Sequence, residues 1–317
     1  MGWLKSLFKK PKDSADRAEA APDVDSDDDD DDDDDEEQTR PAAGAGAAII
    51  AKWDAKLAEI QERWAAMLAE ATEGSAPLVE ATESDLAPLT RPWTAVQNQM
   101  HNFTEEVSDL WDEISDELSE LGDELPDEEM DKQGEKRDLV SCDIEIAYNR
   151  EYHKVMGAAA DKMREWALRA DAKEQKCNRC GAELAKVTPV SQALNVECDY
   201  CQAMNTVKPA DAVRMFAAMG TLYLGERAAH DAWATMTKTE VLIHQYRDDK
   251  DIPLSLLKTY ESSAREFYTT RATVQGDYVP EETKYVENIV ASRMQDVQKT
   301  LRQYWHWREH LKASESA

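Results

Sequence analysis

The segment Ile50-AKWDAKLAEIQERWAAMLAE-Ala71 decides the fold class of this chain. Its apolar residues recur at alternating steps of three and four, which places them on one face of a helix. This heptad pattern is typical of coiled-coil seams. The residues on the seam are Ile50, Trp53, Leu57, Ile60, Trp64, Met67 and Ala71. The cluster Gly74-Ser-Ala-Pro77 is expected to end the helix.

A second helix is expected after Pro92, because the same spacing continues there. Its apolar positions are Trp93, Val96, Met100, Phe103, Val107, Leu110, Ile114, Leu118, Leu121 and Leu125. The outer face is strongly acidic: residues 104–131 contain 14 acids and no base. So many like charges destabilise a helix unless a basic partner covers them, so this face predicts docking of a partner with a basic surface.

Four further helices are expected along the rest of the chain. Residues 135–172 and 209–246 have equal lengths and predict an antiparallel hairpin. A fifth helix is expected over 253–274, broken by Gly276-Asp277, and a last one from Pro280 to about Leu311. The predicted fold is therefore mainly α, an elongated helical bundle of coiled-coil-like helices.

Composition excludes several function classes. The 317 residues carry a net charge of −29, which repels nucleic acid and anionic lipid over most of the surface. No run of 18 apolar residues occurs, and the amino-terminal residues lack the apolar core of a secretory signal. The expected location is the cytoplasm, with a place at the cytoplasmic face of the membrane left open.

The amino-terminal segment combines a basic amphipathic tip with an acidic linker. In residues 1–12, one helical face is apolar and the other carries lysines, a membrane-surface pattern that predicts weak contact. The apolar residues of this tip are Trp3, Leu4, Leu7 and Phe8. Residues 13–46 include an uninterrupted run of acids from Asp27 to Glu37, which predicts a disordered tether.

The strongest chemical motif lies between the two equal helices. Cys177-Asn-Arg-Cys180 is followed by Cys198-Asp-Tyr-Cys201, so four of the five cysteines form two Cys-x-x-Cys turns. Such paired turns predict one tetrahedral metal site. Residues 175–207 resemble a zinc ribbon, and the resemblance implies four ligands and a structural Zn²⁺, one per chain. Gln202 stands where many ribbons have Gly, and the intervening Val187, Val190, Leu194 and Val196 predict a short hairpin.

Four sulfurs close the coordination shell, so the predicted metal site is structural and no enzyme activity is expected. His306-Trp-Arg-Glu309-His310 matches the His-x-x-Glu-His pattern of some metalloproteases, but only seven residues follow it. These histidines are expected to pack or cap the last turns. Glu226 with His230 on the fourth helix is interpreted as a surface or seam pair, and Cys142 as a core residue.

These patterns predict a non-catalytic adaptor or scaffold protein. Its parts are the tip 1–12, the linker 13–46, a three-helix region 47–174, the ribbon 175–207 and a second three-helix region 208–317. Protein partners and self-association through the heptad seams are expected. Two alternatives remain: an accessory factor of transcription or translation machinery that docks through the ribbon, and a metalloenzyme that uses His306 and His310.

Overall fold

The computed structural model describes residues 44–83, 85–122, 125–171, 175–184, 193–279 and 286–315. Contacts divide the chain into one unit, Met1–Ala45, and a second, Gly46–Ala317. The fold and the site described below belong to the second unit. The predictions for the tip 1–12 and the acidic tether, for Val187 and Val190, and for a helix start at Pro280 all lie outside the described residues.

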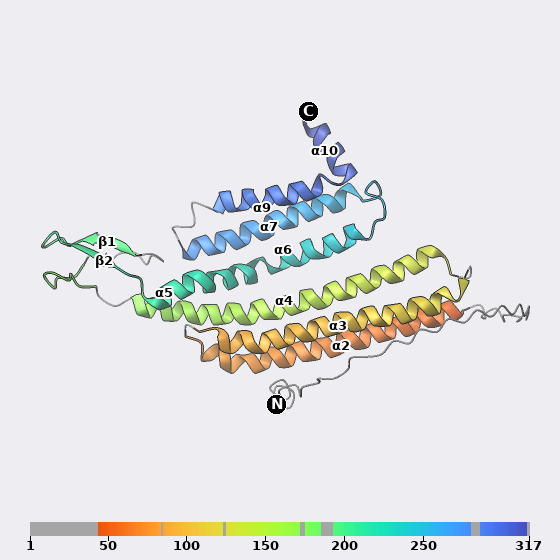
Figure 1. The fold of residues 1–317 in the computed structure, drawn as a ribbon, viewed down its shortest axis with the longest axis horizontal. Helices are drawn as coiled ribbons and strands as arrows, with labels where there is room; N and C mark the ends of the chain where they lie inside the picture. The colour runs from red at the N-terminus through yellow and green to blue at the C-terminus, as the bar shows by residue number, and fades with distance from the viewer. Residues whose placement is uncertain are drawn as a thin grey trace, which may run out of the picture. The chain divides into compact units, whose positions relative to one another are not determined.

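The prediction of a mainly α fold is confirmed (Figure 1). Seven long helical segments and a two-stranded sheet follow one another along the described residues. In chain order the elements are α2 (Ala45–Glu80), α3 (Ala87–Ser119), α4 (Asp127–Asp171), β1 (Leu194–Glu197), β2 (Met204–Val207), α5 (Asp211–Met215), the π-helical turn η2 (Phe216–Gly220), α6 (Thr221–His244), α7 (Leu254–Tyr278), α9 (Val286–Leu301) and α10 (Trp305–Glu315). No described helix is both long enough and apolar enough to cross a membrane.

Helices α2, α3 and α4 share one core. The ring of Trp53 in α2 packs at a tilt against that of Trp111 in α3, with the ring centroids 5.7 Å apart. Farther along α2, the ring of Trp64 lies 5.4 Å from that of Phe103, so α2 and α3 are antiparallel. The indole N–H of Trp64 also donates to the backbone carbonyl of Ile144 in α4 at 3.1 Å. Buried aromatic residues thus hold these three helices together.

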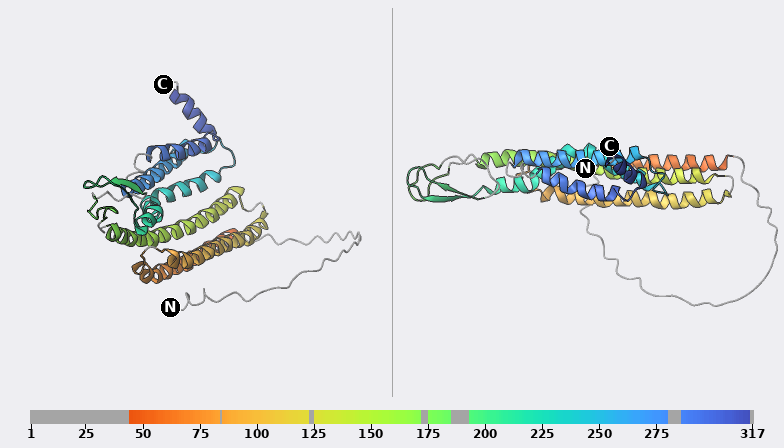
Figure 2. Two further views of the ribbon diagram at one scale, coloured as in Figure 1. Left: turned by 60° about the vertical axis from the view of Figure 1, so that its left-hand side comes forward. Right: turned by 90° about the horizontal axis from the view of Figure 1, so that it is seen from above.

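Helix α4 packs against α6 on its other side, and the predicted antiparallel hairpin is confirmed. Lys238 of α6 pairs with Asp143 near the middle of α4, and Arg227 of α6 pairs with Asp161 nearer its end, both at 2.9 Å. Helices α7 and α9 continue the arrangement beyond α6 (Figures 1 and 2). The last core cluster lies among them and contains Ile243, Ile252, Leu257, Ala264, Met294, Val297, Leu301 and Trp307.

Helix α2 does not end at the Gly-Pro cluster, contrary to the prediction. It continues through Pro77 to Glu80 because Ser75 and Val79 are buried. The hydroxyl of Ser75 donates to the carbonyl of Ala71 and accepts from the indole N–H of Trp93 in α3. Tertiary packing therefore outweighs the low helix propensity of this segment.

The buried seam of α2 repeats every eleven residues rather than every seven. Trp53, Trp64 and Ser75 are successive members of one such series, and Leu57, Leu68 and Val79 form another. Met67, predicted on the seam, is only partly buried, and in α3 Trp111 takes the position predicted for Leu110. Eleven residues in three turns match a nearly straight helix, whereas heptads require a left-handed supercoil.

Four other predicted boundaries were wrong. Helix α3 begins at Ala87 rather than after Pro92, which lies inside the helix. Helix α4 begins at Asp127 rather than 135, because Gln133 is buried and Gly134 lies under the indole of Trp111. Helix α7 runs through Gly276 to Tyr278. The last helix is divided after Leu301, because a turn allows Trp307 to reach back to the same core, where its N–H donates to Gln298.

Candidate metal centre

The four cysteines lie between α4 and α5, on two turns of similar backbone geometry. In the first turn, the N–H of Gly181 donates to the carbonyl of Cys177 at 2.9 Å, and the N–H of Cys177 donates to Ala182 at 2.7 Å. Gly181 has φ +74°, a left-handed conformation that glycine adopts at no steric cost. The turn therefore closes on the first cysteine and brings both thiols to one side.

The second turn repeats this pattern with a residue less suited to it. The N–H of Gln202 donates to the carbonyl of Cys198 at 2.8 Å, and the N–H of Cys198 donates to Ala203 at 3.0 Å. Gln202 has φ +55° and thus adopts the left-handed conformation that Gly181 has in the first turn. Strands β1 and β2 flank this turn as an antiparallel pair, with Glu197 opposite Met204.

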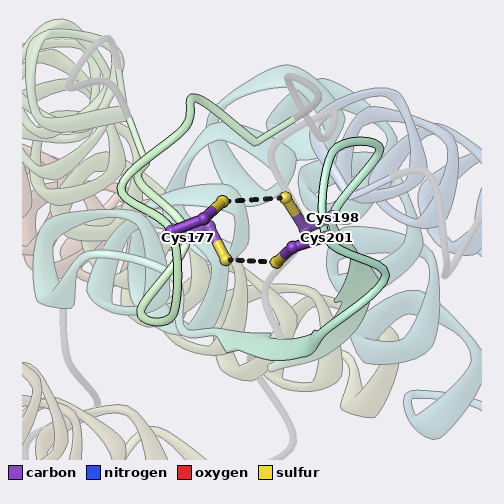
Figure 3. A group of neighbouring side chains, drawn as sticks. Cys177, Cys198 and Cys201 are labelled. Carbon is purple, nitrogen blue, oxygen red and sulfur yellow. Dashed lines mark hydrogen bonds between the residues drawn. The ribbon is translucent and has the colours of Figure 1, made fainter.

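The two turns bring the four sulfur atoms together (Figure 3). The Sγ atoms of Cys177 and Cys201 are 3.6 Å apart, those of Cys180 and Cys198 are 3.7 Å apart, and all four lie within 4.8 Å of one another. Sulfurs bound tetrahedrally at ~2.3 Å from a zinc ion are about 3.8 Å apart. A disulfide would require about 2.05 Å, and all four cysteines are free.

Asn205 supports the cluster from β2 and was not predicted. Its side chain is 3 % exposed, and its Nδ2 lies 3.5 Å from the sulfur of Cys177 and donates to the carbonyl of Ala203 at 2.8 Å. Its Oδ1 accepts from the backbone N–H of Asn178 at 2.9 Å. One side chain therefore joins both turns, as outer residues of metal sites commonly do.

The electrostatics favour a cation at the centre of the four sulfurs. The backbone N–H groups of Cys180 and Arg179, with the Asn205 amide, lower the pKa of Cys177 to about 6. At Cys201 the backbone N–H of Ala203 lowers the pKa, but burial and the neighbouring sulfurs outweigh it and raise the pKa overall. Adjacent thiolates repel each other, and a bound metal cation offsets this repulsion by stabilising all of the negative charges.

These observations show that the four cysteines can hold a metal ion. The donor set is entirely thiolate, which suits a soft or borderline metal. Four protein ligands complete a tetrahedron and leave no position for water or a reactant.

The other sequence motifs are dispersed over the fold. The Nε2 atom of His306 lies 2.7 Å from the carbonyl of Lys250, and the ring of His310 packs at 5.7 Å on Trp307. Glu226 pairs with Arg271 at 2.9 Å. Within the described ranges, the four cysteines are the only group of three or more His, Cys, Asp or Glu side chains placed to share a metal.

Cys142 lies in the α4 core, where burial and then the charge of Asp143 raise its pKa to about 11. A thiol with so high a pKa is almost entirely protonated at neutral pH and is a poor nucleophile.

Comparison with known proteins provides no relative from which a function can be transferred. No protein-family model matches the chain, and searches of curated proteins and of solved structures find no similar protein.

Proposed function

We propose that this protein is a non-catalytic adaptor that presents a metal-clasped tip on a helical support. The observation that supports it best is the separation of the four sulfurs, 3.6 and 3.7 Å within the two pairs and at most 4.8 Å overall. We propose a structural Zn²⁺, one per chain, held by Cys177, Cys180, Cys198 and Cys201. Zinc suits this assignment because it accepts four thiolates in a tetrahedron.

Two exposed apolar side chains on the tip support protein docking. Tyr200, between the cysteines of the second turn, is 81 % exposed, and Met204 at the start of β2 is 64 % exposed. Aromatic and methionine side chains are enriched at protein interfaces. The metal fixes the backbone that carries them, so a partner can bind without the cost of ordering this loop.

Metal analysis of the purified chain tests the proposed zinc site. We expect about one zinc per chain, lost on Cys198→Ser and unchanged on His306→Ala. A metal that disappears with His306→Ala instead would favour a metalloenzyme.

Affinity capture from lysate tests the docking role. The double variant Tyr200→Ala with Met204→Ala should lose bound proteins that the control variant Tyr246→Ala retains. Tyr246 is 39 % exposed and lies elsewhere on the chain. Loss of the same proteins after nuclease treatment would indicate a nucleic-acid bridge.

For location, we propose weak contact with the cytoplasmic face of a membrane through Trp3, Leu4, Leu7 and Phe8. One short amphipathic segment binds lipid reversibly, so it concentrates the protein at a surface without anchoring it. Sedimentation with liposomes should be stronger for the full chain than for a chain that starts at Arg40. Equal sedimentation of the two chains would remove this part of the proposal.

A further inference from the structure

A solvent-open groove of about 630 Å³ runs between α2 and α4. At its base lie the core residues Trp64, Leu68 and Ile144, which are at most 4 % exposed, and the exposed small residues Ala65 and Ala69 line its α2 side. From Gln61 to Glu73, the α2 wall extends over about 18 Å at the helical rise of 1.5 Å per residue. These dimensions accommodate about three turns of another helix.

The face of α2 beside the groove is smooth enough for close helix packing. Its exposed alanines lie on a series of alternating three- and four-residue steps, in which Glu62 and Thr72 occupy the two positions that are not alanine. These alanines are Ala51, Ala55, Ala58, Ala65, Ala69 and Ala76. A second helix can therefore approach closely along this face while its larger apolar side chains enter the groove.

The charges along the groove select the kind of partner. Among the described residues, Glu62 and Glu73 are exposed on α2 and have no ion-pair partner. The basic residues of α2 are already engaged: Lys52 and Arg63 pair with acids of α3, and Lys56 pairs with Glu59. The unpaired charges on this face of α2 are therefore acidic, and two copies that met α2 against α2 would place acid against acid.

We infer that the α2–α4 groove binds an amphipathic helix of a protein partner that carries lysine or arginine beside its apolar stripe. The free acids Glu62 and Glu73 recognise the basic residues, and the apolar base of the groove receives the large side chains. On the α4 side, Arg150 is exposed and makes no ion pair with any described residue, so it selects an acidic residue on the opposite flank of the partner. This inference goes beyond the docking proposed for the metal tip, because the groove lies on other elements.

The test uses the full chain and a fluorescein-labelled 18-residue helical peptide of lysine, leucine and alanine, with leucines at helical spacing. A twin peptide with glutamate for each lysine is the charge control. Fluorescence anisotropy should show saturable binding of the basic peptide and about tenfold weaker binding of the acidic one.

Two matched pairs of variants locate the binding. Glu62→Lys with Glu73→Lys should weaken binding of the basic peptide about tenfold, whereas Glu105→Lys with Asp109→Lys, exposed on α3, should leave it nearly unchanged. Ala69→Trp fills the groove and should abolish binding, whereas Ala228→Trp, at an exposed position of α6, should not. All four positions that receive lysine are exposed, so these substitutions are expected to leave the fold intact. The comparison of the two charge-reversed variants therefore still tests the inference if Ala69→Trp disturbs the fold.

Equal weakening by the two charge-reversed variants would show non-specific attraction to an acidic surface and would overturn the inference. A chain that doubles in mass at the concentrations of the assay, and returns to a monomer with Ala69→Trp, would assign the groove to a second copy and would also overturn it. Zinc content should stay the same in every variant, so a failure here is distinguishable from a failure of the metal tip.

Discussion

The Nδ2 atom of Asn205 lies 3.5 Å from the sulfur of Cys177, while the Oδ1 atom of the same side chain accepts the N–H of Asn178. An amide that donates to a thiolate stabilises its negative charge and fixes its direction. Asn205 therefore links strand β2 to the first cysteine turn, and we expect metal binding by the four cysteines to depend on it.

Asn205→Ala should weaken zinc binding by about tenfold without changing the metal count at saturation. The cause is the loss of the donor to Cys177 and of the restraint on the Asn178 N–H. Competition with a coloured zinc chelator measures the affinity. Asn195→Ala removes an exposed amide of the neighbouring strand and is the matched control. Equal affinities for the two variants would contradict the role of Asn205.

Gln202 is the position where the second turn is strained. Because its φ is +55°, Gln202→Gly should stabilise the turn or leave it unchanged, whereas the β-branched Gln202→Val should destabilise it by about 1–2 kcal/mol. The rate of zinc release to excess chelator is the readout, and it should increase only for valine. Faster release from the glycine variant than from the valine variant would show that the left-handed conformation does not matter.

Two buried tryptophans of α2 provide a matched pair for stability. The indole N–H of Trp64 donates to Ile144, whereas that of Trp53 has no acceptor among the described residues. Both lose volume on substitution by Phe, but only Trp64→Phe also loses a hydrogen bond. Its unfolding free energy should therefore fall by about 1 kcal/mol more than that of Trp53→Phe. Urea denaturation gives the comparison, and the reverse order would contradict the assigned contact between α2 and α4.

The interface of α4 and α6 should weaken in acid. Burial, then the charges of His230 and Arg271, lower the pKa of His153 to about 4, and burial also lowers that of His230, which is 6 % exposed. The unfolded chain, with histidine near pKa 6.5, then binds protons more readily than the folded one. The unfolding free energy should therefore fall as the pH decreases from about 6.5 to about 4 and should vary little through these groups above that range.

His153→Phe isolates this contribution. Between pH 7 and pH 4, the unfolding free energy of the variant should fall by about 2–3 kcal/mol less than that of the unmodified chain, because the variant has no imidazole at position 153 to take up a proton on unfolding. His101→Phe, at an exposed position of α3, should follow the unmodified chain. Denaturant titrations at the two pH values provide the measurement, and parallel losses in all three proteins would show that the buried histidines do not govern the acid response.

Much of the helical architecture could be predicted from the spacing of apolar residues. The heptad-like stripe of residues 50–71 and the hairpin of 135–172 with 209–246 both correspond to helices in the structure. The sequence could not show that Leu68, rather than the predicted Met67, is the buried residue at this turn of α2. Both residues are apolar, and only the packing of α2 against α3 and α4 determines which of them is buried. Pro77 was misleading for a similar reason, since the burial of Val79 favours continuation of the helix.

The cysteine cluster could be predicted from the sequence, but the residue that supports it could not. Two Cys-x-x-Cys turns specify four sulfurs, whereas an asparagine four residues after Cys201 has no pattern that distinguishes it from any other polar strand residue. Its role emerges only when β2 places it beside Cys177. The groove between α2 and α4 was also missed, because it depends on which helices become neighbours in space.

The most direct test of the central claim is the absorption spectrum and metal count of the cobalt-substituted chain. A closed site of four thiolates predicts about one metal per chain, intense tetrahedral cobalt bands with sulfur charge-transfer absorption, and no exchangeable water on the metal. A solvent ligand on the cobalt, or a purified chain that is well folded without any metal, would contradict the claim that the metal is purely structural and fixes the segment that carries the four cysteines.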